Sequence, residues 1–110
     1  RSMNFITYSK AWIKSVNDKD SSMMQDVLSD DFVWSNDRFN WNTNKKETID
    51  WCLDTNFTAV DFSCYYENDE VIVGTHNVIE PGAPDSSVMF IAKIEDNRVV
   101  SHQQLREFER

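Results

Sequence analysis

The chain has 110 residues, 40% hydrophobic and 13% aromatic, which is enough apolar mass for a single domain over 1–110 and excludes a disordered chain. Its net charge of −8 repels phosphate backbones and anionic lipid surfaces, so we expect neither nucleic acid nor a membrane as a partner. No apolar run approaches the roughly 20 residues of a membrane-spanning helix.

Apolar residues at helical spacing predict three helices in the first half of the chain. The first covers residues 4–17, where Phe5, Tyr8, Trp12 and Val16 share one face. Asp20 is a plausible N-cap for a short second helix, which we expect to end at residues 30–31. A short strand over residues 32–34 and a polar loop over residues 35–44 follow. Trp41 in that loop is a possible lid over a pocket.

Asn44 followed by Glu47 resembles a capping box and predicts a third helix over residues 45–54. After Asn56 the apolar period changes to two, which is typical of half-buried strands. Turns and prolines separate strands near residues 60–66, 70–80, 87–95 and 98–108. Helices followed by a strand meander predict an α+β domain, with the helices covering one face of the sheet.

Two segments resemble the nuclear transport factor 2-like (NTF2-like) superfamily, within its SnoaL-like and ketosteroid-isomerase-like branches. They are YSKAWIKSVNDKDSSMMQDVLSDDFVW and EDNRVVSHQQLREF. The resemblance covers nearly the whole chain. It implies a cone-shaped α+β domain in which three N-terminal helices pack on a curved mixed or antiparallel sheet and enclose one pocket. This fold carries isomerases, cyclases, hydrolases, dehydratases and plain binding proteins, so it leaves the reaction open.

The isomerase site of that superfamily can be checked position by position. An ungapped alignment places Trp12 at the helix tyrosine, Asn36 at the catalytic base and Phe90 at the late aspartic acid. Indole, amide and phenyl groups cannot perform the same acid–base steps, so that isomerase chemistry is not expected. A shift of one residue would put Asp37 at the base position instead, and both Asn36 and Asp37 remain candidates.

Strand parity then predicts which side chains face the pocket, because alternate residues share one face of a strand. The expected inward set is Trp34 and Asn36; Val73, Thr75, Asn77 and Ile79; Val88, Phe90, Ala92 and Ile94; and His102, Gln104 and Arg106. From it, together with Trp12 of the first helix, we take Trp34, Thr75, Asn77, Phe90, Gln104 and Arg106 as ligand-binding residues. An apolar wall with polar groups at one end suits a small, moderately polar molecule.

His102 is the main candidate for chemistry, since imidazole can act as a general acid or base near neutral pH. Asn36 and Gln104 would orient a water or polarise a carbonyl. The first hypothesis is therefore a cofactor-independent isomerase, cyclase or hydrolase acting on a small, largely apolar substrate. The alternatives are a non-catalytic ligand-binding module and a protein-interaction module. Two isolated histidines without ligand spacing predict no metal site.

The same parity places His76 on the outer face of the sheet, together with Ile72, Val78, Met89 and Ile91. Such an apolar face would normally be covered, which predicts a homodimer through it. Cys52 and Cys64 lie in apolar segments without CxxC spacing, and we expect both to be buried, reduced thiols. Reduced thiols favour a cytoplasmic location.

Overall fold

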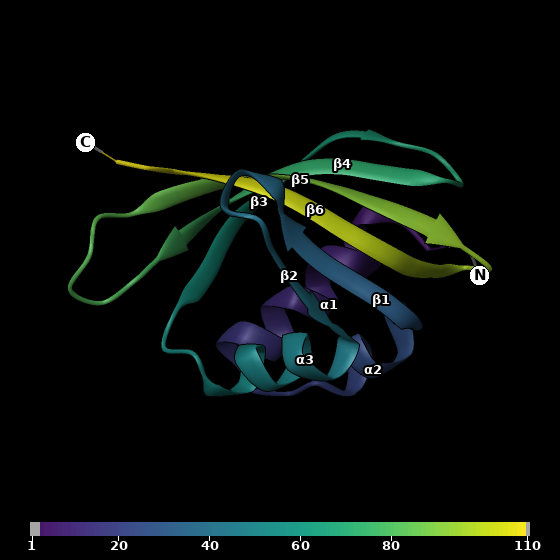
Figure 1. The fold of residues 1–110 in the computed structure, drawn as a ribbon, viewed down its shortest axis with the longest axis horizontal. Helices are drawn as coiled ribbons and strands as arrows, with labels where there is room; N and C mark the ends of the chain where they lie inside the picture. Colours follow the sequence, from purple (N-terminus) through teal and green to yellow (C-terminus); the bar gives the residue numbers. More distant parts are fainter. Residues whose placement is uncertain (1–2, 110) are drawn as a thin grey trace.

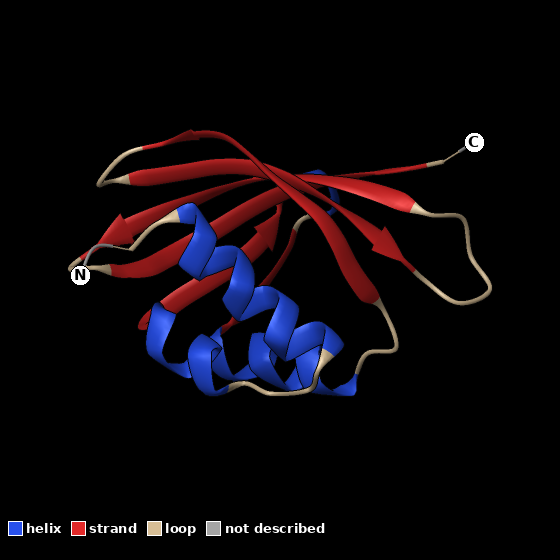
Figure 2. Cartoon of the chain, turned by 180° about the vertical axis from the view of Figure 1, so that it is seen from behind, coloured by secondary structure: helices blue, strands red, loops and turns tan. Residues whose placement is uncertain are grey.

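The computed structural model describes residues 3–109 and shows three helices on one face of a strongly curved sheet (Figures 1 and 2). The elements are α1 (Phe5–Asn17), α2 (Ser22–Val27), β1 (Leu28–Asn36), the short 3-10 helix η1 (Asp37–Phe39), β2 (Trp41–Asn44), α3 (Lys45–Asp54), β3 (Thr58–Glu67), β4 (Val71–Ile79), β5 (Ser86–Glu95) and β6 (Arg98–Phe108). No helix in residues 3–109 is long and apolar enough to span a membrane.

One mixed sheet contains all six strands, in the order β2-β1-β6-β5-β4-β3. β1 runs parallel to β6, and the remaining neighbours are antiparallel. Along the chain, the helices and the β1–β2 hairpin precede the other strands. The last strand, β6, lies between β1 and β5 and so joins the hairpin to the rest of the sheet. The α+β architecture predicted from the sequence is confirmed.

Side-chain caps explain where the first and third helices begin. The Asn4 side chain accepts a hydrogen bond from the Thr7 backbone N–H at the start of α1. Asn44 and Glu47 form the expected reciprocal capping box, and α3 covers the predicted residues 45–54. These oxygens satisfy N–H groups that would otherwise lack partners at a helix N-terminus.

The second helix is shorter than the sequence indicates. Its N-cap position is Ser21 rather than the predicted Asp20, although the Asp20 side chain accepts a hydrogen bond from the Ser22 backbone N–H. The helix ends at Val27, so the expectation that it ends at residues 30–31 was wrong. Leu28 instead opens β1, where it pairs with Val99 of β6. Lys45 also reaches the Leu28 carbonyl oxygen from α3, at 2.9 Å. Pairing with distant strands thus decides this boundary, which local helix spacing cannot reveal.

The predicted loop over residues 35–44 is mostly ordered into a hairpin. β1 continues to Asn36, which pairs with Trp41 at the start of β2. Asn40 adopts a left-handed backbone (φ 50°) and ends η1 between the two strands. Asparagine tolerates that conformation better than most residues, so the tight turn is compatible with the polar sequence.

The β4 strand has the opposite facing from the one predicted. Ile72 and Val78 are buried under the helices, whereas Thr75 and Asn77 lie on the outer face. Directly paired residues share a face, and Ile72 pairs with Ala92 of β5, which fixes this parity. The ungapped alignment was therefore out of phase by one residue here, although it was in phase for β1, β5 and β6.

Gly74 sits on the concave side of β4 because no side chain fits there. A Cβ atom at this position would lie 2.9 Å from Phe90 Cζ and 2.9 Å from the Ser63 carbonyl oxygen. It would also meet the Phe5 ring of α1 at 3.1 Å. The glycine thus permits the close approach of α1 to the sheet. Opposite this packed end, the helices diverge from the sheet and leave a hollow.

The third strand departs from simple alternation. Its pairing with β4 shifts register between Val60 and Ser63 and again between Cys64 and Tyr66. As a result Cys64 is exposed, contrary to the sequence expectation, while Cys52 is buried as predicted. Both thiols are free.

Candidate functional site

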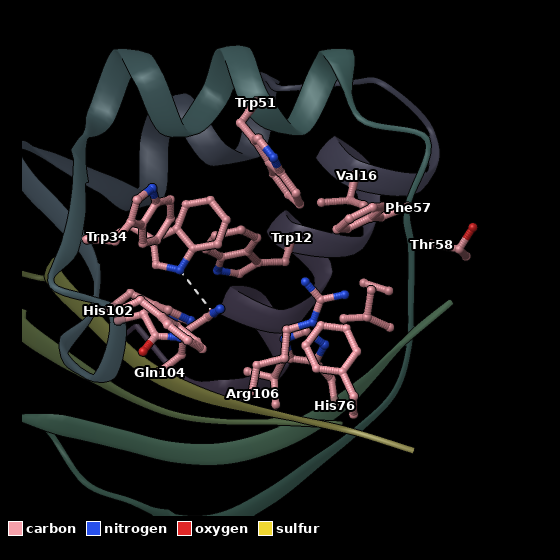
Figure 3. A pocket seen from close by; sticks show the side chains of 17 residues that line it. Trp12, Val16, Trp34, Trp51, Phe57, Thr58, His76, His102, Gln104 and Arg106 are labelled. Carbon is pink, nitrogen blue, oxygen red and sulfur yellow. Dashed lines mark hydrogen bonds between the residues drawn. The ribbon is translucent and has the colours of Figure 1, made fainter. Parts of the chain in front are cut away.

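A cavity of about 560 Å³ lies between the helices and the concave face of the sheet (Figure 3). Its walls are largely aromatic and aliphatic, with a few polar groups contributed mainly by β6. The lining residues are Trp12, Val16, Trp34, Asn36, Phe39, Trp41, Trp51, Phe57, Thr58, Ala59, His76, Val78, Val88, His102, Gln104, Arg106 and Phe108. The volume is within the range of small-molecule sites.

Three successive inward residues of β6 form a polar line along the cavity. His102 pairs laterally with Trp34 of β1 and Ala92 of β5, and Gln104 pairs with Phe90. Arg106 pairs with Val88, which in turn pairs with His76 of β4. The imidazole, the amide and the guanidinium therefore follow one another at two-residue intervals of about 6.7 Å along the strand.

His102 is anchored from behind by the first helix. The Tyr8 hydroxyl lies 2.6 Å from His102 Nδ1, and both residues are buried. Phe90 stacks on the imidazole at a centroid distance of 4.7 Å and an interplanar angle of 15°. With Nδ1 engaged by Tyr8 and one face of the ring covered by Phe90, Nε2 is the ring nitrogen that remains for Gln104, whose side chain bonds with His102, or for a ligand in the cavity.

Burial keeps this pair uncharged. It lowers the pKa of His102 to about 3, and the neighbouring His76 lowers it further while Gln104 opposes the shift. Burial also raises the pKa of Tyr8 far above its ordinary value. The tyrosine is therefore a protonated donor at neutral pH. When it donates to Nδ1, the imidazole proton resides on Nε2, where Gln104 or a ligand oxygen can accept it.

Four tryptophans surround the space beside His102. Trp34 contacts the rings of Trp12, Trp41 and Trp51 edge-on, at centroid distances of 5.2, 4.8 and 5.1 Å. Its indole N–H donates to Gln104 Oε1 at 3.0 Å, which fixes both side chains (dashed in Figure 3). This cluster presents flat apolar surfaces that suit a planar molecule.

The indole N–H of Trp12 is the buried side-chain donor that the described residues leave without a hydrogen bond. It lies close to the Tyr8 hydroxyl, and its hydrogen-bonding contact there acts against the rise in the pKa of Tyr8 that burial causes. An unsatisfied buried donor costs free energy.

At the other end of the polar line, Arg106 is held in a defined position. Its Nε donates to Ser86 Oγ at 2.8 Å, and its Nη2 lies 3.2 Å from Glu80 Oε1. The guanidinium also lies over the rings of Phe57 and Phe108, at 5.1 and 4.5 Å from their centroids. His76, stacked on Phe62, lines the same end.

The structure brings together most of the residues predicted for the site. The predicted residues that line the cavity are Trp12, Trp34, Asn36, His102, Gln104 and Arg106. Asn36 is buried there, and its Oδ1 accepts a hydrogen bond from the Arg38 backbone N–H. Trp41 lines the cavity at its exposed rim, in a strand rather than in the loop expected for a lid.

Four predicted site residues lie elsewhere. Asp37 is exposed in η1, where it accepts a hydrogen bond from Gln103, so the one-residue shift is not supported. Thr75 and Asn77 face outward because of the β4 parity, and Asn77 bonds with Asp61 and Ser87 there. Phe90 is 1% exposed and lies behind His102 rather than in the cavity wall.

The sequence reasoning missed Tyr8, Trp51 and His76. Tyr8 precedes Trp12 by one helical turn, so the same face of α1 that carries Trp12 also carries the tyrosine. Trp51 projects from α3 into the cavity and is only partly buried. His76 was placed on the outer face by the wrong parity. The pairing of Gly74 with the large Phe90, which the assembled sheet reveals, fixes the correct parity.

Within residues 3–109, no group of three or more histidine, cysteine or acidic side chains is arranged to hold a metal ion. The residues that line the cavity include no aspartate or glutamate. Hydrogen bonding by imidazole, amide, indole and guanidinium groups is therefore the chemistry that the cavity wall provides.

No family model matches the sequence, and no curated protein matches it either. Solved structures do match the fold. An NTF2-like protein of unknown function from Cytophaga hutchinsonii has a TM-score of 0.74 at 10% identity, over 97% of this chain and 95% of its own. A putative ketosteroid isomerase from Kribbella flavida has a TM-score of 0.78 at 6% identity, over 93% and 76%.

An LEH-like epoxide hydrolase from M. tuberculosis has a TM-score of 0.66 at 13% identity, over 90% of this chain and 79% of its own. The chain therefore has the NTF2-like fold over nearly its full length, as the two sequence segments indicated. Proteins of this fold include ones named as putative isomerases and as an epoxide hydrolase.

Proposed function

We propose that this protein binds a small, flat, largely apolar molecule in the cavity and recognises one of its oxygen atoms through His102. The observation that carries the proposal is the Tyr8–His102 contact of 2.6 Å at the wall of an aromatic cavity of about 560 Å³. The tyrosine satisfies one nitrogen of the buried imidazole and holds the ring in place, so the second nitrogen is positioned to bond with Gln104 or with a ligand.

The protonation state of His102 favours binding over proton abstraction. With its pKa at about 3, the imidazole is neutral at physiological pH and is a very weak base. It serves better as a fixed hydrogen-bond donor to a carbonyl or hydroxyl oxygen. The aromatic walls supply the affinity for the rest of the molecule through apolar burial.

Cofactor-independent catalysis is the second candidate. His102, Trp12 and Asn36 all line the cavity, and their N–H groups can stabilise negative charge that develops on a carbonyl or epoxide oxygen. The lack of a cavity carboxylate among the described residues leaves no strong base for an isomerisation. Water addition, with Asn36 and Gln104 orienting the water, fits the residues better.

The binding proposal can be tested with 2-naphthol, a flat probe with one hydroxyl group, by quenching of tryptophan fluorescence. Saturable binding is expected, and His102→Ala should weaken it about tenfold through loss of one hydrogen bond in a dry site. Thr75→Ala, on the outer face, is the matched control and should leave the affinity unchanged. Absence of saturable quenching, or equal effects of the two substitutions, would contradict the proposal.

Turnover separates the two candidates. If the protein hydrates an aromatic epoxide such as styrene oxide, and His102→Ala abolishes diol formation while Thr75→Ala does not, the catalytic candidate replaces simple binding. Binding of 2-naphthol without turnover of such substrates supports the binding module.

We also propose a homodimer through the outer face of the sheet. Ile72 and Val78, expected there, are buried inside, but Met89 and Ile91 are 47% and 41% exposed. Leu105, which pairs with Met89 in the sheet, is 58% exposed. This apolar group on a curved sheet is the surface that a second copy would cover.

The free thiols of Cys52 and Cys64 accord with a cytoplasmic location.

Sedimentation velocity at micromolar concentration should show a dimer for the wild type. Met89→Lys together with Leu105→Lys should give a folded monomer, because two lysines would have to lose their hydration in the interface. A wild-type monomer under these conditions would contradict the dimer.

A further inference from the structure

We propose that the natural ligand is an amphipathic carboxylate, with its carboxylate at Arg106 and a carbonyl or hydroxyl oxygen at His102. The inference rests on the proposed function, since it names the class of molecule that the same cavity takes. It is carried by the arrangement of charge and of hydrogen-bond donors along β6.

The first argument is the charge of the cavity wall. Arg106 carries the one permanent charge among the cavity-lining residues, and no acidic residue lines the space, although the chain as a whole has a net charge of −8. Figure 3 shows Arg106 reaching from β6 toward Trp12 and Phe57. A single cation among apolar walls interacts much more strongly with an anion than the same cation does in water.

The second argument is that the guanidinium is held in place and retains free donors. Ser86 and Glu80 engage Nε and Nη2, and Phe57 and Phe108 cover its faces. Within residues 3–109, these are the hydrogen bonds that Arg106 makes, so its Nη1 remains available to a ligand. Glu80 offsets part of the charge, but its side chain is 29% exposed at the edge of the site. An arginine fixed in this manner loses little conformational entropy when it binds a carboxylate.

His76 adds a second nitrogen donor at the same end. It lies in the same lateral row of the sheet as Arg106, joined through Val88. Burial and the charge of Arg106 lower its pKa, although its backbone contact with Asn77 acts against this. A ligand carboxylate beside both groups would offset the effect of the arginine and favour protonated imidazole, which adds attraction for the anion.

The spacing sets the shape of the ligand. Arg106 follows His102 by four residues on one strand, which corresponds to about 13 Å along the cavity wall. A ligand that reaches both ends of the polar line is therefore elongated, and a rigid body of about two fused rings has such a shape. The tryptophans and the Gln104 side chain lie between the two ends.

Two other interpretations of these residues make different predictions. If the Arg106–Glu80 pair is only structural, the charge of the ligand should not matter. If the four tryptophans instead form a cage for a cation, a quaternary ammonium group should be preferred over a carboxylate.

The test compares 6-hydroxy-2-naphthoate with its neutral methyl ester and with 2-naphthol, by isothermal titration calorimetry. The wild type should bind the carboxylate at least tenfold more tightly than the ester, as expected for a charge-assisted hydrogen bond. Arg106→Gln should abolish this preference and retain 2-naphthol binding. Arg98→Gln, which removes an exposed arginine at the start of β6, should leave the preference unchanged.

Glu80→Gln provides a variant that keeps the arginine and removes its partner. It should strengthen carboxylate binding severalfold and leave ester binding unchanged, and this outcome does not depend on how well Arg106→Gln folds. Equal affinities for carboxylate and ester in the wild type, or tighter binding of the trimethylammonium analogue, would overturn the inference while the proposed function stands. Failure of the whole series, 2-naphthol included, would overturn both.

Discussion

Acidification should destabilise the wild-type protein more steeply than a variant that lacks the His102 imidazole. The folded state holds the pKa of His102 at about 3, below the ordinary value near 6.5. Between these pH values the unfolded chain binds a proton that the folded chain does not, so the free energy of unfolding decreases as the pH falls. From pH 6.5 to 4.5 the loss attributable to His102 is about 2–3 kcal/mol.

His102→Asn is the matched variant, since an amide can accept the Tyr8 hydrogen bond in place of Nδ1 but does not titrate. Urea unfolding of both proteins across this pH range gives the difference between their free energies of unfolding. The contributions of the shared carboxylates and of His76 cancel in that difference. The difference should change by about 2–3 kcal/mol. Parallel pH profiles would show that His102 protonates equally in the folded and unfolded states.

Removal of the Phe90 ring should produce the largest loss of stability. Phe90 is buried between Tyr8 and His102, with ring centroids at 6.1 and 4.7 Å, so Phe90→Ala leaves a cavity beneath the site. The expected decrease in the free energy of unfolding is about 3–5 kcal/mol. Phe90→Leu, which keeps most of the volume, should cost less than about 1.5 kcal/mol. Denaturant unfolding measures both.

The same pair of variants tests the corrected position of Phe90. Since the ring lies behind His102 and does not line the cavity, Phe90→Leu should bind 2-naphthol with wild-type affinity. A loss of affinity as large as that of His102→Ala would place Phe90 in contact with the ligand, as the sequence alignment had suggested.

The sequence predicted the positions of the helices and strands better than it predicted which face of the sheet each side chain occupies. The first and third helices follow from periodicity and the Asn44–Glu47 capping box, because both signals are local. The start of β1 at Leu28 and the parity of β4 depend on pairing with distant strands, which local patterns do not encode. The ungapped alignment placed β1, β5 and β6 correctly, and with them Asn36, His102, Gln104 and Arg106.

The candidate site was only partly predictable for the same reason. Tyr8 contacts His102 across 94 residues of sequence, and nothing in the first helix distinguishes a tyrosine that packs from one that holds an imidazole. The juxtaposition of His76 and Arg106 at one end of the cavity was hidden as well, because the wrong parity put His76 on the outer face. The protonation state of His102 requires its burial, which follows from the assembled fold.

The central claim is that a neutral, tyrosine-bound imidazole points Nε2 into a ligand cavity, and imidazole ¹⁵N NMR tests it most directly. The His102 nitrogen shifts should stay those of a neutral ring protonated on Nε2 from pH 7 to 4.5, and 2-naphthol should move the Nε2 shift more than the Nδ1 shift. A ring that titrates near pH 6.5, or one whose shifts ignore the ligand, would contradict the claim.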